Sequence, residues 1–292
     1  MAISTPLDAS PPEASNARAF AWMSVALVGF LTLGLAGRAL ARDVSLYQLL
    51  VYRNAICLVF VIALLPHTGL AILRTRYIGR HLVRNACHIA GQYLWFFAVV
   101  WLPLTEVFAI EFTTPIWTAL FAATVLGERM TRWRTLAIAL GFTGVLLILR
   151  PGASIIAPAS LAAVGAAVCF AVTYCFTKAL VAEERPMTIL FWMHLMQLPM
   201  GLSPALVHGW VNPPLSQAHL VAAIGIAGFA THYCIARAMR HADATVVAPL
   251  DFLRLPIGAV IGWAFYAEAL DPIVVLGAAL ILTGNWTNLR RG

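Results

Sequence analysis

Residues 93–118 read YLWFFAVVWLPLTEVFAIEFTTPIWT, and residues 233–258, 140 positions later, read YCIARAMRHADATVVAPLDFLRLPIG. Both segments begin with Tyr and share Ala and Thr at equivalent places, and the correspondence continues to the end of the chain. Glu111 falls opposite Asp251, so each copy carries an acid in the middle of an apolar run. The sequence therefore predicts a duplicated unit and two structurally similar halves.

The composition indicates a membrane protein that crosses the bilayer several times. Of the 292 residues, 61% are hydrophobic and 11% are charged. A soluble domain carries about 25% charged residues, and it could not hide this much apolar surface. The net charge of +7 does not predict nucleic-acid binding, because most arginines lie in short loops between apolar runs. The five cysteines lie inside apolar runs without zinc-ligand spacing, so we expect neither a metal site nor a cofactor.

Ten apolar runs are close to the ~20 residues that a helix needs to cross the hydrocarbon core. They cover approximately residues 20–37, 46–65, 84–102, 105–126, 134–149, 160–181, 187–206, 218–239, 245–266 and 272–289. Residues 1–18 are rich in Ala, Ser, Pro and acids, which predicts a disordered cytoplasmic tail. A cleavable signal peptide is an alternative interpretation of the first run, but its loss would leave four spans in the first half against five in the second.

The loop arginines predict the orientation of the chain. With the N-terminus in the cytoplasm, twelve arginines fall in cytoplasmic segments and three in outer loops. The cytoplasmic set is Arg18, Arg74, Arg76, Arg80, Arg84, Arg129, Arg132, Arg134, Arg185, Arg240, Arg290 and Arg291, and the outer set is Arg38, Arg42 and Arg150. Because Lys and Arg collect in cytoplasmic loops, we expect both termini in the cytoplasm.

An odd number of spans in each half predicts that the second half is inserted upside down. We place the first half at residues 19–152 and the second at residues 153–292, with five spans each. In transporters built from inverted halves, the substrate site lies where the halves meet. The predicted fold is therefore an all-α polytopic membrane protein, with ten transmembrane helices in two inverted five-helix repeats.

Charged residues inside the apolar runs are candidates for a substrate site, because each costs at least ~2.5 kcal/mol at a helix centre. Arg254 follows Asp251 by three residues, so the two share one helix face and can neutralise each other. The pair is either a charged cavity wall or a structural ion pair. Glu111 holds the equivalent place in the fourth run, where Pro115 interrupts the backbone ladder. It is either a proton-coupling carboxylate or a protonated packing residue.

Polar and aromatic side chains form a stripe along the third run. His88, Gln92 and Trp95 follow i, i+4, i+7 spacing, and His232 lies on the corresponding part of the eighth run. Lipid cannot satisfy the hydrogen bonds of such groups, so we expect the stripe of the third run and His232 of the eighth run to line a cavity. The predicted substrate-binding residues are Trp22, His88, Gln92, Tyr93, Trp95, Glu111, Trp117, Tyr174, His232, Tyr233, Asp251, Phe252 and Arg254.

Arg53, Lys178 and Arg237 also lie within apolar runs, and we expect them to face protein or a water-filled cavity. Lys178 is near a helix end, so an alternative is that it reaches the cytoplasmic surface.

Four short motifs in the first copy occur in an order typical of a known transporter family. Residues 102–105 read LPLT, residues 126–129 read LGER, residues 140–147 read LGFTGVLL and residues 150–152 read RPG. This order resembles the EamA module of the drug/metabolite transporter superfamily. The second copy departs from the pattern, because Ala267 precedes Glu268 where Gly is usual, and its proline comes one place later, at Pro256.

The resemblance implies ten helices in two inverted halves and transport without nucleotide hydrolysis. It implies a central cavity among spans 1, 3, 4, 6, 8 and 9. Within the superfamily, the chain is most similar to bacterial amino acid exporters.

The predicted function is alternating-access export of a small metabolite, with amino acids, aromatic or otherwise apolar, as the leading substrate class. The alternative within transport is a larger metabolite, a vitamin, a nucleotide derivative or a drug-like cation. An enzyme is not expected, because the sequence holds no H-E-x-x-H, G-x-S-x-G or Walker motif. A membrane receptor or an assembly factor is a remote alternative.

The expected partners are a small-molecule substrate and the lipid of a bacterial inner membrane. The spacing of Gly258 and Gly262 is typical of helix contact within a subunit or between subunits, and it leaves a homodimer open.

Overall fold

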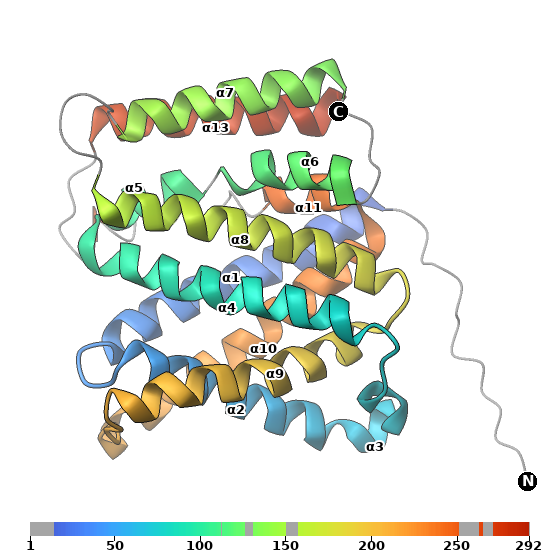
Figure 1. Cartoon of the computed structure of the whole chain (residues 1–292), viewed down its shortest axis with the longest axis vertical. Coiled ribbons are helices and arrows are strands. Elements are labelled where there is room, and N and C mark those ends of the chain that lie inside the picture. The colour runs from blue at the N-terminus through green and yellow to red at the C-terminus, as the bar shows by residue number, and fades with distance from the viewer. Residues whose placement is uncertain are drawn as a thin grey trace, which may run out of the picture.

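The computed structural model describes residues 15–111, 113–125, 131–149, 157–250, 263–264 and 271–291. Three predicted site residues, Asp251, Phe252 and Arg254, lie outside the described residues, as do Gly258, Gly262 and most of the predicted tail. The described helices are α1 (Asn16–Leu40), α2 (Leu46–Ala63), α3 (Leu65–Thr68), η1 (Leu70–Leu73), α4 (Ile78–Trp101), α5 (Leu104–Glu111), α6 (Thr114–Val125), α7 (Arg132–Leu149), α8 (Pro158–Val181), α9 (Pro186–Val207), η2 (Leu215–Gln217), α10 (Ala218–His241), α11 (Ala244–Leu250) and α13 (Pro272–Arg291). Figure 1 shows their arrangement.

Five helical segments are long and apolar enough to cross a membrane: α1, α2, α8, α9, and α10 together with η2. Large apolar side chains are exposed on their surfaces, such as Val28 and Val59, each 65% exposed, and Leu206, 60% exposed. Many large apolar side chains exposed in this way are costly in water and stable in lipid. The all-helical architecture of a membrane protein therefore agrees with the prediction.

Local sequence explains where several helices begin. Ser45 caps α2, and the Gln48 side chain completes a capping box with the Ser45 backbone. Pro158 and Pro186 occupy the first positions of α8 and α9, where a missing N–H breaks no helical hydrogen bond. In contrast, α4 begins at Ile78, several residues before the apolar run. Arg84, predicted at the cytoplasmic start of the third span, therefore lies inside this helix and not at its first residue.

The chain before residue 150 and the chain after residue 157 are interleaved. α1 packs along α10, α4 along α8, α2 along α9, and α7 along α13 (Figure 1). Each pair combines one helix from each part of the chain. These pairs bring residues that are far apart in the sequence to the same depth in the bundle.

The fourth predicted span is divided into α5 and α6. Pro115 has no N–H to donate to the carbonyl of Glu111, four residues before it. The Thr114 hydroxyl donates to that carbonyl instead, and Thr113 Oγ1 donates to Ile110 O at 2.8 Å. The structure thus confirms that Pro115 interrupts the helix beside Glu111.

Candidate functional site

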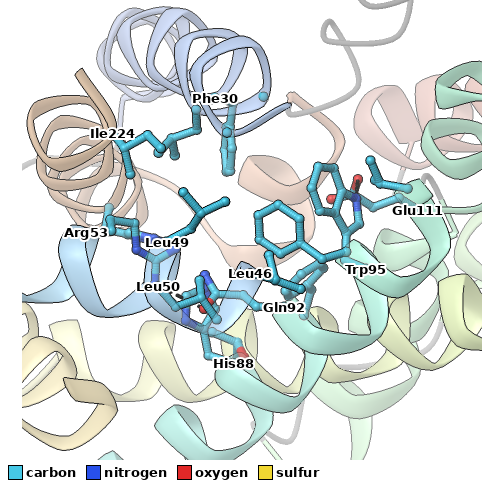
Figure 2. A pocket seen from close by; sticks show the side chains of 18 of the residues that line it. Phe30, Leu46, Leu49, Leu50, Arg53, His88, Gln92, Trp95, Glu111 and Ile224 are labelled. Atoms are coloured by element: carbon cyan, nitrogen blue, oxygen red, sulfur yellow. Dashed lines mark hydrogen bonds between the residues drawn. The ribbon is translucent and has the colours of Figure 1, made fainter. Parts of the chain in front are cut away.

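A cavity of about 400 Å³ lies between α1, α2, α4, α5, α6, α8 and α10. Small-molecule sites range over roughly 300–1,000 Å³, so this volume suits a metabolite. Six predicted residues line it: His88, Gln92, Trp95, Glu111, Tyr174 and His232. The structure therefore brings the stripe on the third span and His232 of the eighth span to one cavity, and Figure 2 shows the stripe in its wall.

Four predicted residues lie outside this lining. Trp22 packs edge-on against Tyr233, with 6.0 Å between the ring centroids, and the Arg237 guanidinium lies 4.9 Å from the Trp22 ring. The Tyr93 hydroxyl donates to Met200 O at 3.2 Å. Trp117 Nε1 donates to the hydroxyl of Thr113, four residues earlier in the chain, at 3.1 Å. A role of these four in binding remains a prediction.

Arg53 on α2 is part of the cavity wall, and the side chain is only 5% exposed. Its Nη2 atom donates to Gln92 Oε1 at 3.0 Å and to Gln197 Oε1 at 3.4 Å. Gly228 makes room for the aliphatic stem, because a Cβ atom there would lie 2.7 Å from Arg53 Cγ. The guanidinium is thus held by α4 and α9, and the aliphatic stem packs against α10.

Gln197 on α9 links Arg53 to a second buried arginine. Its Nε2 atom donates to His88 Nδ1 at 2.9 Å and to Asn85 Oδ1 at 3.3 Å. The same Asn85 oxygen accepts from Arg84 Nη1 at 2.8 Å. One continuous network therefore holds both arginines at the cavity.

Arg84 is 3% exposed and also lines the cavity. Its Nε atom donates to the Thr177 hydroxyl of α8 at 2.8 Å.

The imidazole rings of His88 and His232 meet edge to face, with 4.9 Å between their centroids. Because Gln197 donates to His88 Nδ1, that nitrogen carries no proton, and His88 is held as the neutral Nε2–H tautomer. His232 is 8% exposed. These rings supply hydrogen-bonding groups to the cavity.

Trp95 and Glu111 form a second polar position. Trp95 Nε1 donates to Glu111 Oε2 at 2.8 Å. Figure 2 shows this pair at the opposite side of the cavity from Arg53. Aromatic and aliphatic side chains complete the walls, among them Phe30, Leu49, Leu50, Phe96 and Phe170. Such a mixture can hold a flat apolar ring and orient polar groups at both ends.

The cavity reaches one end of the bundle and stops short of the other. Its lining extends to Arg38, Ala41 and Leu46, around the α1–α2 connection, which we call the Arg38 end. Toward the α8–α9 connection, which we call the Glu184 end, the lining goes as far as Arg84 and Thr177.

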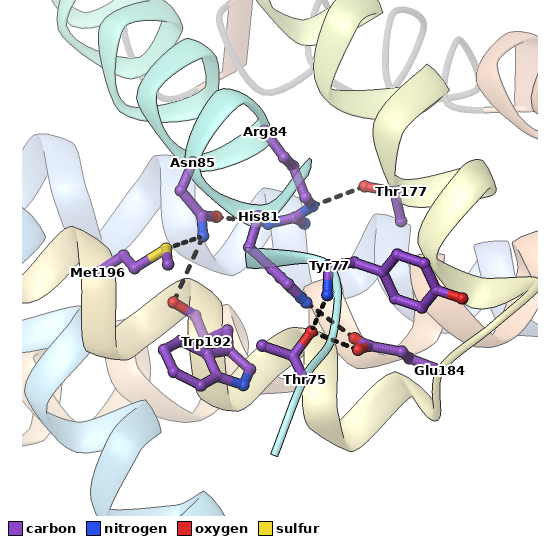
Figure 3. Close-up of polar contacts among 9 residues, drawn as sticks. All are labelled: Thr75, Tyr77, His81, Arg84, Asn85, Thr177, Glu184, Trp192 and Met196. Atoms are coloured by element: carbon purple, nitrogen blue, oxygen red, sulfur yellow. Dashed lines mark hydrogen bonds and ion pairs between the residues drawn. The ribbon is translucent and has the colours of Figure 1, made fainter. Parts of the chain in front are cut away.

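A polar cluster closes the bundle at the Glu184 end (Figure 3). Glu184 accepts from the Thr75 hydroxyl through Oε1, and its Oε2 atom lies 2.8 Å from His81 Nε2. In the same region, the hydrogen bond to Glu183 is the main cause that raises the pKa of the Tyr77 phenol. Thr75 and His81 belong to the first part of the chain and Glu184 to the second, so the cluster joins the two parts.

Lys178 makes a further connection at the Glu184 end. Its ammonium group donates to Met239 O at 3.1 Å and to Ala242 O at 3.0 Å, and it lies 3.2 Å from an Asp243 carboxylate oxygen. Lys178 therefore binds the end of α10.

Sequence reasoning missed the role of α2 in the cavity. The sequence identifies Arg53 as an intramembrane charge, but the predicted site residues do not include it. Arg84 counts among the cytoplasmic arginines, although it is also the first residue of the third run. The signal that could have found Arg53 is its isolation in an apolar run beside Asn54, since two adjacent polar residues there need protein partners.

The sequence profile of the EamA-like transporter family matches residues 17–150 and again residues 157–289. A riboflavin transporter of Rhizobium johnstonii is 31% identical over 90% of this chain and 88% of that protein. An S-adenosylmethionine uptake transporter of Rickettsia bellii is 24% identical over 89% of each chain. The pseudopaline exporter CntI of Pseudomonas aeruginosa is 27% identical over 80% of this chain and 83% of that protein.

A solved crystal structure matches with a TM-score of 0.69 and 21% identity, and the match covers 94% of this chain and 96% of the other. At that identity the likeness shows the fold alone. The relatives named above do not support amino acid export. They fit better with the alternative of a vitamin or a larger metabolite.

Proposed function

This chain belongs to the EamA-like transporter family, and from that premise we propose that its central cavity carries a vitamin-like or similarly sized metabolite across the membrane. The chain is a multi-pass membrane transporter of the bacterial inner membrane and not an enzyme.

One observation carries the proposal: the cavity of about 400 Å³ has polar groups at two separated positions and aromatic side chains between them. Arg53 and Gln92 form one position, and Trp95 with Glu111 forms the other. A ring-bearing metabolite with hydrogen-bonding groups at both ends suits this arrangement. The similarity to a riboflavin transporter supports the same size class.

We propose further that the two halves, residues 19–152 and 153–292, are inverted repeats of five helices each. The helix pairs support this, because a two-fold relation between the halves converts the α1–α10 pair into the α4–α8 pair. It converts the α2–α9 and α7–α13 pairs into themselves. The family match to two successive segments supports a duplicated unit.

We also propose that both termini lie in the cytoplasm, so that the Glu184 end faces inward and the Arg38 end faces outward. Arg74, Arg76, Arg80 and Arg185 near the Glu184 end support this orientation. The described conformation is then outward-facing, since the cavity lining reaches the Arg38 end. Alternating access requires the Thr75–His81–Glu184 cluster to open as the Arg38 end closes.

The test is counterflow in liposomes that hold the purified protein and unlabelled riboflavin. We expect labelled riboflavin to enter these vesicles faster than it enters protein-free vesicles. A parallel panel of labelled amino acids provides the comparison. Exchange of amino acids without exchange of riboflavin would overturn the proposal and restore amino acid export.

A further inference from the structure

The two buried arginines of the cavity wall have no carboxylate partner among the described residues. Arg53 donates to the side-chain oxygens of Gln92 and Gln197. Arg84 donates to Thr177 and Asn85. All four acceptors are neutral, so hydrogen bonds fix the guanidinium groups without balancing their charge.

Such a cation is expensive at membrane depth. A buried charge costs several kcal/mol unless an opposite charge compensates it, and charged residues inside membrane helices mark substrate pathways. In addition, the buried Arg53 Nε atom has no hydrogen-bond acceptor in the described part of the structure. Arg53 is therefore a cationic group that hydrogen bonds hold in place, and its Nε–H can still donate to a ligand.

Among the described lining residues of the cavity, positive charges outnumber negative ones. Arg38, Arg53 and Arg84 belong to the described lining, and Glu111 is the acid that faces them. Glu111 lies across the cavity beside Trp95, whose Nε1 atom donates to it (Figure 2). The wall at Arg53 is therefore electropositive and attracts a negative group.

We infer that the cavity selects an organic anion, whose carboxylate or phosphate binds Arg53. Arg84, which the hydrogen-bond network joins to Arg53, adds a second positive charge to the same wall. The ring of the substrate lies against Trp95 and Phe30. The inference rests on the proposed function and names the charge class of its substrate.

The test compares pairs of ligands that differ only in charge. Riboflavin and riboflavin 5′-phosphate share one ring system, and the phosphate adds about −1.5 to −2 charge at pH 7. Indole-3-acetamide and indole-3-acetate form a smaller pair. The affinity of each ligand follows from the concentration dependence of the thermal unfolding midpoint of the purified protein in detergent.

In the unmodified protein we expect the anion of at least one pair to bind about tenfold more tightly than its neutral partner, because hydrogen bonds to charged groups are the strong ones. Arg53→Gln should remove this preference, and Arg53→Lys should retain part of it. Arg80→Gln is the matched control. It removes an exposed arginine one turn before Arg84 on the same helix and should leave the preference unchanged.

Equal affinities within both pairs in the unmodified protein overturn the inference, whether or not the variants fold. A preference that survives in full in Arg53→Gln also overturns it, because the anion then binds elsewhere. Riboflavin exchange without any charge preference leaves the proposed function standing and removes the inference alone. A preference within the indole pair only, with no flavin exchange, sustains the inference and removes the vitamin-like substrate.

Discussion

Glu184 and His81 join two distant parts of the chain. The Glu184 Oε2 atom lies 2.8 Å from His81 Nε2, although 103 positions separate the residues, and His81 is completely buried. Thr75 donates to the other oxygen of the same carboxylate. This carboxylate is the centre of the closure at the Glu184 end.

Glu184→Gln should weaken that closure, because an amide replaces a charged acceptor that holds two partners. Hydrogen bonds to charged groups contribute about 1.5–3 kcal/mol, so the ratio of open to closed molecules should rise about tenfold or more. Spin labels at the exposed positions Arg76 and Ala182 would report the distance across this end in a cysteine-free background. Arg185→Gln, at an exposed neighbour, is the control. An unchanged distance distribution in Glu184→Gln would exclude a closing role for the cluster.

Gly228→Ala should displace Arg53. The added Cβ would lie 2.7 Å from Arg53 Cγ and 2.9 Å from Cδ, closer than side chains approach without movement. Overpacking of this kind costs about 1–3 kcal/mol, so the unfolding midpoint in detergent should fall and transport should decrease. Gly79→Ala is the matched substitution, because nothing lies within 4 Å of its Cβ. Equal effects of the two substitutions would mean that the close approach at Gly228 does not position Arg53.

Trp95 and Glu111 should act as one unit in transport. Trp95→Phe removes the indole donor, and Glu111→Gln replaces the carboxyl acceptor of the same 2.8 Å hydrogen bond. Because residues in contact couple by about 0.5–3 kcal/mol, the double variant should lose less kcat/KM than the two single losses combined. Initial counterflow rates over a range of substrate concentrations provide the four values of the cycle. Strict additivity would show that the hydrogen bond has no part in transport.

Lys178→Met should destabilise the packing of α8 on the end of α10. The ammonium group satisfies two backbone carbonyls, and a buried carbonyl left without a donor costs about 1–3 kcal/mol. The midpoint of thermal unfolding should therefore fall. Asp243→Asn should have little effect, because the Asp243 side chain is 63% exposed and surface ion pairs contribute little. A larger fall of the unfolding midpoint in Asp243→Asn than in Lys178→Met would show that the ion pair, and not the carbonyl contacts, stabilises the packing of α8 on α10.

The parts of the fold that depend on periodicity could be predicted from the sequence. The i, i+4, i+7 spacing of His88, Gln92 and Trp95 correctly indicated one cavity-lining face, and Pro115 correctly indicated a helix break. Each of these properties is local, because it depends on residues within about two turns of one helix.

The contacts of Arg53 could not be predicted in this way. Its acceptors Gln92 and Gln197 lie 39 and 144 positions away, and no spacing within α2 indicates which helices surround it. Arg84 was missed for a different reason: hydropathy places it at the edge of an apolar run, whereas the helix begins at Ile78. A charged residue one or two turns inside a helix resembles a loop residue until its tertiary partners are known.

The interleaving of helices also constrains how the protein is made. Arg53 enters the membrane 144 residues before Gln197 is synthesised, which at 5–20 residues per second is a delay of roughly 7–30 s. During that interval the nascent chain holds a cation whose acceptor on α9 does not yet exist. The later helices therefore complete the polar contacts of the earlier ones, and a chain whose synthesis stops midway lacks the α9 acceptor of Arg53.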